Sequence, residues 1–388
     1  MRWASAHSDI HDAGDAAEQA AAAIASELGA EPVDLVIAFF GASHVPGVET
    51  LAETLRARLK PGCLVGSSAH GVISSTREIE AVPALTVIAA RLPGVEVDPF
   101  VLASDAWAAA VDDPDAFARC APDVAGAELV LLFGDPFSLD VEACLAAFNR
   151  HAPGIRVVGG LASAGVKPGS NALILNDWVA NEGGVALALK GALRVDVVVS
   201  QGCRPVGPPL EVTRAEGNML LELDGQPALE RAEQVLLGLA EREREYLKKG
   251  LYVGRPVHSG AAERGDYLIR NLLGADRDRG IIAIGDQATE RQRIRLHVRD
   301  AQTAREDLEL MLSPQAFDAP ARGALLFACN GRGRGLYGEP DRDITTLQSA
   351  LGGAVPAGGM FCAGEVGPVG EKNYLHGHTA SIAIVRAK

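Results

Sequence analysis

The chain has 388 residues, 48% of them hydrophobic, and a formal net charge of −14 at neutral pH. This length is enough for two domains, or for one large duplicated domain with a sizeable core. The negative charge argues against a nucleic-acid-binding surface, and the aromatic content of 5% argues against platforms for base stacking. We therefore expect an acidic, solvated surface and no nucleic-acid partner.

The six cysteines form no CxxC pair, and Asp9, Asp12 and Asp15 interrupt any apolar segment at the start of the chain. A secretory signal requires such a segment. A membrane-spanning helix needs roughly 20 apolar residues, and no run of that length occurs. The sequence therefore predicts no membrane insertion and a cytoplasmic protein whose thiols stay reduced.

A repeated unit runs through most of the chain. An alanine-rich stretch at 12–28 first predicts an N-terminal helix within 1–29. Three copies of one unit follow. Each copy consists of a strand, a helix, a second strand that ends in a small-residue loop, and a third strand. Their first strands begin near Val33, Ala127 and Ala324, and their helices near Leu51, Val141 and Ile344. A degenerate fourth copy is read between 195 and 285.

These elements predict an α/β or α+β fold of two pseudo-repeated halves, in which helices cover mixed sheets. The segment 205–230 is rich in proline and glycine, so we expect it to carry the crossover between the halves. We place the domains at 30–227 and 228–388.

Two matching loops, GSSAHG at 66–71 and GGLASAG at 159–165, follow strands of the first two copies. Their small and hydroxyl side chains suit contact with a polar ligand or with the other half. Tight turns that need no ligand are the alternative.

Reactive and charged residues gather beside glycines in the last sixty residues. Glycine allows close approach of other groups, and loops at strand ends commonly carry binding sites. The residues expected at or near strand ends are Cys329, Asn330, Arg332, Glu365, His376 and His378. We interpret them as one site.

Three motifs here resemble the FIST family: CNGRG at 329–333, GEVGP at 364–368 and LHGHTAS at 375–381. GCRPVGPP at 202–209 and LDGQPALE at 223–230 resemble its N-terminal half. The resemblance implies a ligand-sensing module that feeds kinases, chemoreceptors or cyclic-nucleotide enzymes. Because we recognise no output domain in the sequence, we expect a signalling partner in trans.

A small polar metabolite, such as an amino acid, would suit these residues. Arg332 presents a fork that matches a carboxylate, and Glu365 could accept an ammonium group. Asn330, His376 and Thr379 would orient the ligand, and Cys203 with Arg204 would contribute from the first half. Arg334 is a weaker candidate for binding an anion. Alternatively, Arg332 pairs internally with Glu339, Asp341 or Glu365.

His376 and His378 would face the same side of a strand, as a metal pair with Glu365 or Cys329 could require. The ligand set is incomplete, so we favour hydrogen bonding and predict no metal. Cys329 could be a nucleophile with His376 as its base. We favour an unreactive thiol, and expect no enzyme activity.

Some FIST proteins are haem proteins that sense nitric oxide, so the resemblance leaves a haem-based gas sensor as an alternative. Such a sensor needs an axial ligand in an apolar cavity. His70 and His151 are the candidates in the first half. Neither lies in a haem-attachment motif, and we predict no resident cofactor.

Overall fold

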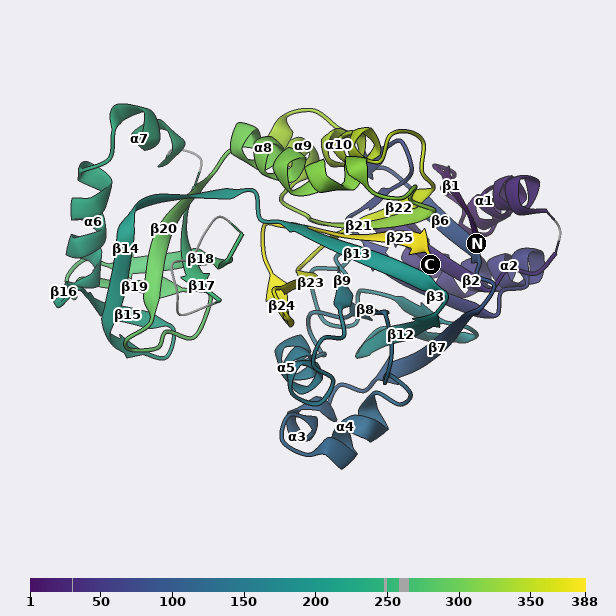
Figure 1. Ribbon diagram of the computed structural model, residues 1–388, viewed down its shortest axis with the longest axis horizontal. Coiled ribbons are helices and arrows are strands. Elements are labelled where there is room, and N and C mark those ends of the chain that lie inside the picture. Colours follow the sequence, from purple (N-terminus) through teal and green to yellow (C-terminus); the bar gives the residue numbers. More distant parts are fainter. Residues whose placement is uncertain (30, 248–249, 258–264) are drawn as a thin grey trace. The chain divides into compact units, whose positions relative to one another are not determined.

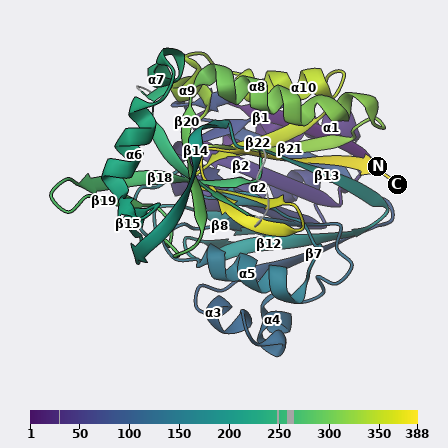
Figure 2. The ribbon, with the colours of Figure 1, turned by 60° about the vertical axis from the view of Figure 1, so that its left-hand side comes forward.

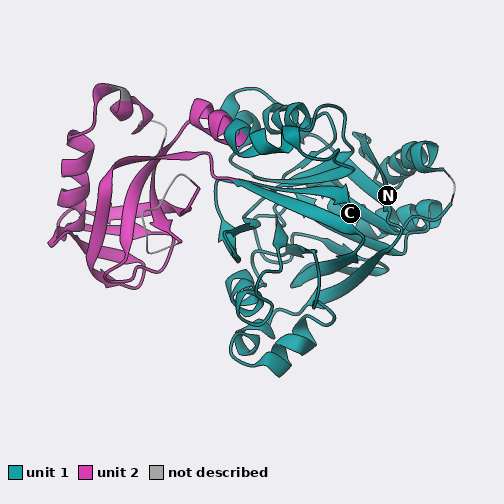
Figure 3. Cartoon of the chain, in the orientation of Figure 1, with its two compact units in different colours: residues 1–199, 309–388 teal, residues 200–308 magenta. Residues whose placement is uncertain are grey.

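The computed structural model describes residues 1–29, 31–247, 250–257 and 265–388 (Figure 1). It contains about 27% helix and 41% strand, which confirms the mixed α/β fold with mixed sheets. The chain divides into two compact units (Figure 3). Unit 1 comprises residues 1–199 and 309–388, and unit 2 comprises residues 200–308.

Unit 1 contains the predicted unit three times, twice in the first half of the chain and once in the second. Each copy adds an edge strand before the expected strand, helix, strand and strand. Copy one has β1 (Arg2–Ser8), β2 (Leu35–Gly41), α2 (Val48–Leu59), β3 (Cys63–Ala69) and β6 (Leu85–Arg91); copy two has β7 (Val95–Leu102), β8 (Leu129–Gly134), α5 (Val141–His151), β9 (Val157–Leu161) and β12 (Gly184–Gly191); copy three has β13 (Leu193–Ser200), β21 (Gly323–Cys329), α10 (Arg342–Ala350), β22 (Ala357–Cys362) and β25 (Ala380–Ala387).

Each copy builds the centre of one six-stranded sheet in the same way. The two strands that flank the helix pair in parallel, and the last strand pairs antiparallel with the first of them. The edge strand then pairs with that last strand. A helix between parallel neighbours is the connection that parallel pairing requires, so the local pattern determines the mixed sheets.

Hairpins link the three sheets in a cycle. Each hairpin follows the second parallel strand of its own copy but joins the sheet of another copy. The hairpin β4 (Gly71–Ile73) and β5 (Glu78–Glu80) pairs with β22; β10 (Leu173–Leu175) and β11 (Trp178–Ala180) pairs with β3; β23 (Glu365–Val369) and β24 (Lys372–His376) pairs with β9. The copies are therefore interlocked, and none has a complete sheet of its own.

One core lies between the three sheets. Phe39, Phe133 and Phe327 occupy equivalent positions on β2, β8 and β21, and their ring centroids are 5.3, 5.9 and 5.8 Å apart. All three rings are fully buried. Aromatic pairs at these distances stabilise beyond the area they bury. The predicted threefold repeat thus produces a threefold aromatic centre.

Helices cover the outer faces of these sheets. α1 (Ala13–Leu28) and α2 bury an alanine- and leucine-rich face on the first sheet. α3 (Trp107–Ala110), α4 (Pro114–Cys120) and α5 cover the second, as Figure 2 shows. α9 (Gly333–Tyr337), α10 and the 3₁₀ helix η2 (Ser313–Phe317) belong to the third copy. The helix expected at 12–28 is α1, while the strand β1 before it was not anticipated.

Unit 2 is a seven-stranded sheet with the strand order β14, β20, β17, β18, β19, β15 and β16. Its strands are β14 (Cys203–Glu216), β15 (Met219–Leu223), β16 (Gln226–Pro227), β17 (Leu251–Pro256), β18 (Tyr267–Asp276), β19 (Ile281–Ile284) and β20 (Arg293–Arg299), with helices α6 (Ala228–Leu237) and α7 (Glu241–Leu247). The pairings of its described residues are antiparallel. Helix α8 (Ala301–Leu312) spans the boundary with unit 1.

The expected fourth copy is therefore wrong, whereas the crossover between halves expected at 205–230 stays a prediction. The described part of unit 2 lacks the parallel pair that defines the repeat, and 205–230 forms strands within this unit. Val206 and Leu210 are buried, and the register shifts between them. Pro208 and Pro209 lie at this shift, where their missing N–H groups are tolerated. Among the described residues, no helix is long and apolar enough to span a membrane.

Candidate functional site

The C-terminal motifs meet at one end of the third sheet in unit 1. Cys329 and Cys362 are the last residues of the parallel strands β21 and β22, and their Cα atoms are register partners. The backbone N–H of Cys329 donates to the carbonyl of Thr379 at 2.9 Å, and that of Asn330 donates to the carbonyl of Cys362 at 2.9 Å. Glu365 begins the hairpin that follows. The structure thus brings together residues from all three motifs.

Glu365 is a fully buried carboxyl group. Its Oε2 accepts hydrogen bonds from the backbone N–H of Thr379 at 3.0 Å and from the Thr379 hydroxyl at 2.8 Å. Register pairing places it opposite His376 on the neighbouring strand. Burial of a carboxyl group is costly unless hydrogen bonds compensate, and Thr379 supplies two of them.

The two histidines differ in role. His376 is buried, and its Nε2–H donates to the carbonyl of Gly367 at 2.9 Å. His378 is half-buried and has φ = 70°, a left-handed conformation that is uncommon outside glycine. Such strain concentrates at functional sites. Among the described residues, no group of three or more His, Cys, Asp or Glu side chains is arranged to hold a metal ion.

Arg332 lies in the turn after β21, but its guanidinium group is fully buried. Its Nε and Nη2 donate to the two carboxylate oxygens of Asp343 at 2.6 and 2.7 Å, and Nη2 also donates to the Tyr337 hydroxyl at 2.7 Å. Burial disfavours the charge, but Asp343 outweighs it, so the pKa of Arg332 lies well above its ordinary value. This geometry makes Arg332 a partner within the protein rather than a group presented to solvent.

Arg332 pairs internally, as its alternative interpretation had it, but the partner is Asp343 and none of the three acids named for it. Glu339 pairs with Arg342, and the Asp341 carboxylate accepts the backbone N–H of Glu78 at 2.6 Å. Asp343 lies in the first turn of α10, and its carboxylate accepts both hydrogen bonds from Arg332. Distance along the sequence favoured the nearer acids, and only the fold identifies the correct one.

Glu78 is a buried acid that the sequence did not single out. It comes from the exchanged hairpin of copy one, and its Oε1 accepts the backbone N–H of Ile344 at 2.9 Å. Burial and the neighbouring Asp343 raise the pKa of Glu78 to about 8. Its other oxygen, and Nη1 of Arg332, are buried without a hydrogen-bond partner among the described residues. Copies one and three are therefore joined through a buried charged cluster.

The small-residue loop at 159–165 contacts the second half of the chain, which is one of the roles expected for the two loops. The Ser163 hydroxyl donates to the carbonyl of Phe361 at 2.5 Å. A Cβ atom at Gly160 would lie 2.4 Å from the Cys362 sulfur, so this glycine makes room for the thiol.

Cys203 and Arg204 lie in unit 2, at the start of β14. Cys203 packs in a small apolar cluster with Tyr267 and Ile269. The guanidinium of Arg204 lies over the ring of Tyr246, 4.1 Å from its centroid, as in a cation–π contact. These two residues belong to a separate compact unit from the strand-end site.

The two histidines named as candidate haem ligands lie in different surroundings. His70 is exposed on the turn between β3 and β4. His151 uses Nε2 to donate to the carbonyl of Val111 at 3.1 Å, and its ring packs on Phe117.

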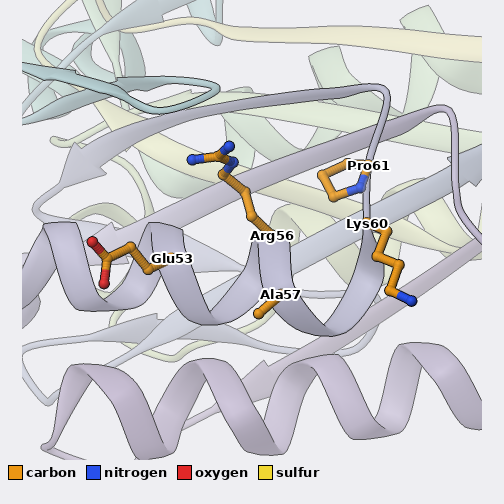
Figure 4. A pocket seen from close by; sticks show the side chains of 5 residues that line it. All are labelled: Glu53, Arg56, Ala57, Lys60 and Pro61. Carbon is orange, nitrogen blue, oxygen red and sulfur yellow. The ribbon is translucent and has the colours of Figure 1, made fainter.

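A surface cavity of about 440 Å³ lies on the outer side of α2 (Figure 4). Glu53 and Arg56 from the helix and Lys60 and Pro61 from the turn after it are among its lining residues. A second cavity of about 360 Å³ shares Glu53 and Arg56 and extends to Trp178. No sequence-predicted site residue lines either cavity, and no motif pointed to them.

Comparison with known proteins decides the family. The FIST N domain matches residues 34–226, and the FIST C domain matches residues 228–368. The chain belongs to the FIST family. FIST domains are sensory domains that bind small ligands in signalling, so this function holds for the chain at that level.

Relatives of this FIST protein include an uncharacterised protein of Mycobacterium tuberculosis, 38% identical over 388 residues and covering 99% of both chains. An uncharacterised protein of Mycobacterium bovis is 37% identical over 378 residues, 96% of each chain. Among solved structures, cyanuric acid hydrolase from A. caulinodans aligns with a TM-score of 0.38 at 8% identity, over 100% of this chain and 99% of that one.

Proposed function

We propose that the chain binds a small polar metabolite, an amino acid being the first class to test, at the strand-end site of unit 1. The observation that carries this proposal is the convergence of Glu365, His376 and Thr379 with a histidine held at positive φ. A buried carboxyl group beside such a strained residue is typical of a built site. The ligand signal would pass to a separate protein, such as a kinase or a cyclic-nucleotide enzyme.

The groups that meet the ligand would be those near the surface of the turn and hairpin. Asn330 and Arg334 are exposed, and His378 is half-buried. Arg334 lacks a side-chain ion pair among the described residues, so its guanidinium is available to a ligand carboxylate. Glu365 and Thr379 would orient the loop from inside, while Arg332 with Asp343 keeps the turn in place.

A thermal-shift screen of individual L-amino acids and related acids tests the proposal. Ligand at about 100 times its Kd stabilises the folded state by about 2.7 kcal/mol, which is readily seen. We expect Asn330→Ala, Arg334→Ala and His378→Asn to weaken the shift, because asparagine tolerates the backbone of His378 but lacks the imidazole. His11→Asn, on the exposed N-terminal side of α1, is the matched control. A shift that all three variants retain would place the ligand elsewhere.

A further inference from the structure

Cys329 and Cys362 form a pair that no spacing motif in the sequence reveals. They end neighbouring parallel strands and are register partners, so their side chains project from the same face of the sheet. Neighbouring strands lie about 4.8 Å apart, within the roughly 4.4–6.8 Å between Cα atoms that a disulfide spans. All six cysteines of the chain are thiols in this structure.

The surroundings of the two thiols differ. The backbone N–H of Gly331 points at the Cys329 sulfur at 3.4 Å, and the guanidinium of Arg332 interacts electrostatically with it. N–H groups and cations favour a thiolate. Cys362 is fully buried, and its S–H donates to the carbonyl of Met360 at 3.6 Å. Burial, followed by Glu365 and Cys329, holds the pKa of Cys362 well above its ordinary value.

The difference in exposure between the two thiols determines which of them is oxidised first. Cys329 has 8% of its surface exposed and lies beside the exposed Asn330, whereas Cys362 has none. Oxidants therefore reach Cys329 first. Cys362 lies at the end of the central core and has room for its sulfur because residue 160 is glycine.

We propose that Cys329 and Cys362 are a redox pair that a hydroperoxide converts to a disulfide, which would couple the strand-end site to oxidation. The Cys329 thiolate attacks one oxygen of hydrogen peroxide, the O–O bond breaks, and the released hydroxide takes up the thiol proton as water. Cys362 then attacks the sulfur of the Cys329 sulfenic acid, the S–S bond forms, and the S–O bond breaks to release a second water. Two thiols are oxidised by two electrons as the peroxide is reduced.

Asn330 directly follows Cys329, and Glu365 lies three residues after Cys362, so the disulfide would pull on both sides of the site. The Asn330 N–H already donates to the Cys362 carbonyl, so the two strand ends are held in register before oxidation. This proposal does not depend on which metabolite binds, and it could hold even if no amino acid does.

The test is non-reducing tryptic mass spectrometry of the full chain after stoichiometric hydrogen peroxide. Cleavage after Arg322, Arg332, Arg342 and Lys372 puts the two cysteines on separate peptides, 323–332 and 343–372. We expect these peptides to be crosslinked and two of the six thiols to be lost. Cys362→Ser should instead trap a dimedone-reactive sulfenic acid on Cys329, and Cys329→Ser should abolish both products.

Cys120 and Cys144 supply an internal control, because they also lie within electrostatic reach of each other and burial raises the pKa of both thiols. A crosslink between Cys120 and Cys144 in preference to 323–332 with 343–372 would overturn the proposal. So would an intact set of thiols together with no dimedone adduct in Cys362→Ser. Refolding problems in one serine variant are distinguished by circular dichroism, and Cys362→Ala then serves as the second variant.

Discussion

Arg332 and Asp343 form a bidentate ion pair that is buried on both sides, with 0% and 1% of their side chains exposed. The pair joins the glycine turn after β21 to α10, and the Tyr337 hydroxyl closes the network by donating to Asp343 at 2.8 Å. A buried charge that loses its partner is strongly destabilising. Arg332, the arginine of the CNGRG motif, therefore stabilises the fold at this turn.

Asp343→Ala should destabilise the protein by about 3–5 kcal/mol, because it leaves the Arg332 guanidinium buried without a counter-charge. Chemical denaturation measures this change. The double variant Arg332→Met with Asp343→Leu should recover most of the loss, since apolar replacement of both partners removes the desolvation cost. Equal losses in the single and double variants would show that the ion pair is not what matters there.

Phe133→Ala should cost about 3–5 kcal/mol of unfolding free energy, the usual range for a buried phenylalanine. Phe39→Ala and Phe327→Ala should cost similar amounts, because the three rings occupy equivalent positions around one centre. Phe317→Ala is the control, since that ring is 92% exposed. A small effect at one of the three buried rings would contradict a shared aromatic centre.

Glu78 should make stability fall as the pH rises. Its folded-state pKa of about 8 lies above its ordinary value of 4.5, so the folded state binds more protons between these values. The loss of stability begins near pH 4.5 and is complete once the pH passes about 8. Glu78→Gln keeps an acceptor for the Ile344 N–H but cannot titrate. Urea denaturation from pH 5 to 9 should therefore give a flatter profile for the variant, and parallel profiles would refute this assignment.

His297 in unit 2 should make stability fall as the pH is lowered, which is the opposite of the effect of Glu78. Burial lowers the pKa of His297 to about 4, below its ordinary value of 6.5. The unfolded state then binds more protons between pH 6.5 and 4, so stability is lost on acidification through this range. The ring packs against Tyr267 at 4.7 Å and leaves no room for a Cβ at Gly254. His297→Gln should reduce the acid sensitivity, as monitored by tyrosine fluorescence, whereas an unchanged acid limb would exclude His297 as its source.

Periodicity and glycine punctuation were enough to predict the three copies, because each strand and helix carries its own local pattern. Exchange of the hairpins could not be predicted, since a strand pattern does not say which sheet the strand joins. Glu78 was missed for this reason: its importance comes from the third copy, which lies more than two hundred residues away. The strands within the Pro- and Gly-rich segment 205–230 could not be predicted, because prolines that lie at a register shift give the same composition as a turn.

Within the site, the sequence motifs identified which residues lie close together. They did not identify the hydrogen-bond and ion-pair partners of those residues. Glu365 and Thr379 could be placed together from neighbouring motifs, and the structure adds the two hydrogen bonds between them. The partner of Arg332 could not be predicted, because it depends on the direction of helix α10, which residue spacing in the sequence does not determine. The pairing of Cys329 with Cys362 could not be predicted, because it depends on the register of the two strands, and that register is determined only in the assembled sheet.

Hydrogen–deuterium exchange of the full chain, with and without a saturating mixture of the L-amino acids, is the decisive test of ligand binding at the strand-end site. We expect slower exchange in 329–333, 363–366 and 376–379, because a ligand at the strand-end site would hold these segments in place. Unchanged exchange there, or protection confined to 49–60 and 177–179 beside the α2 cavities, would contradict it.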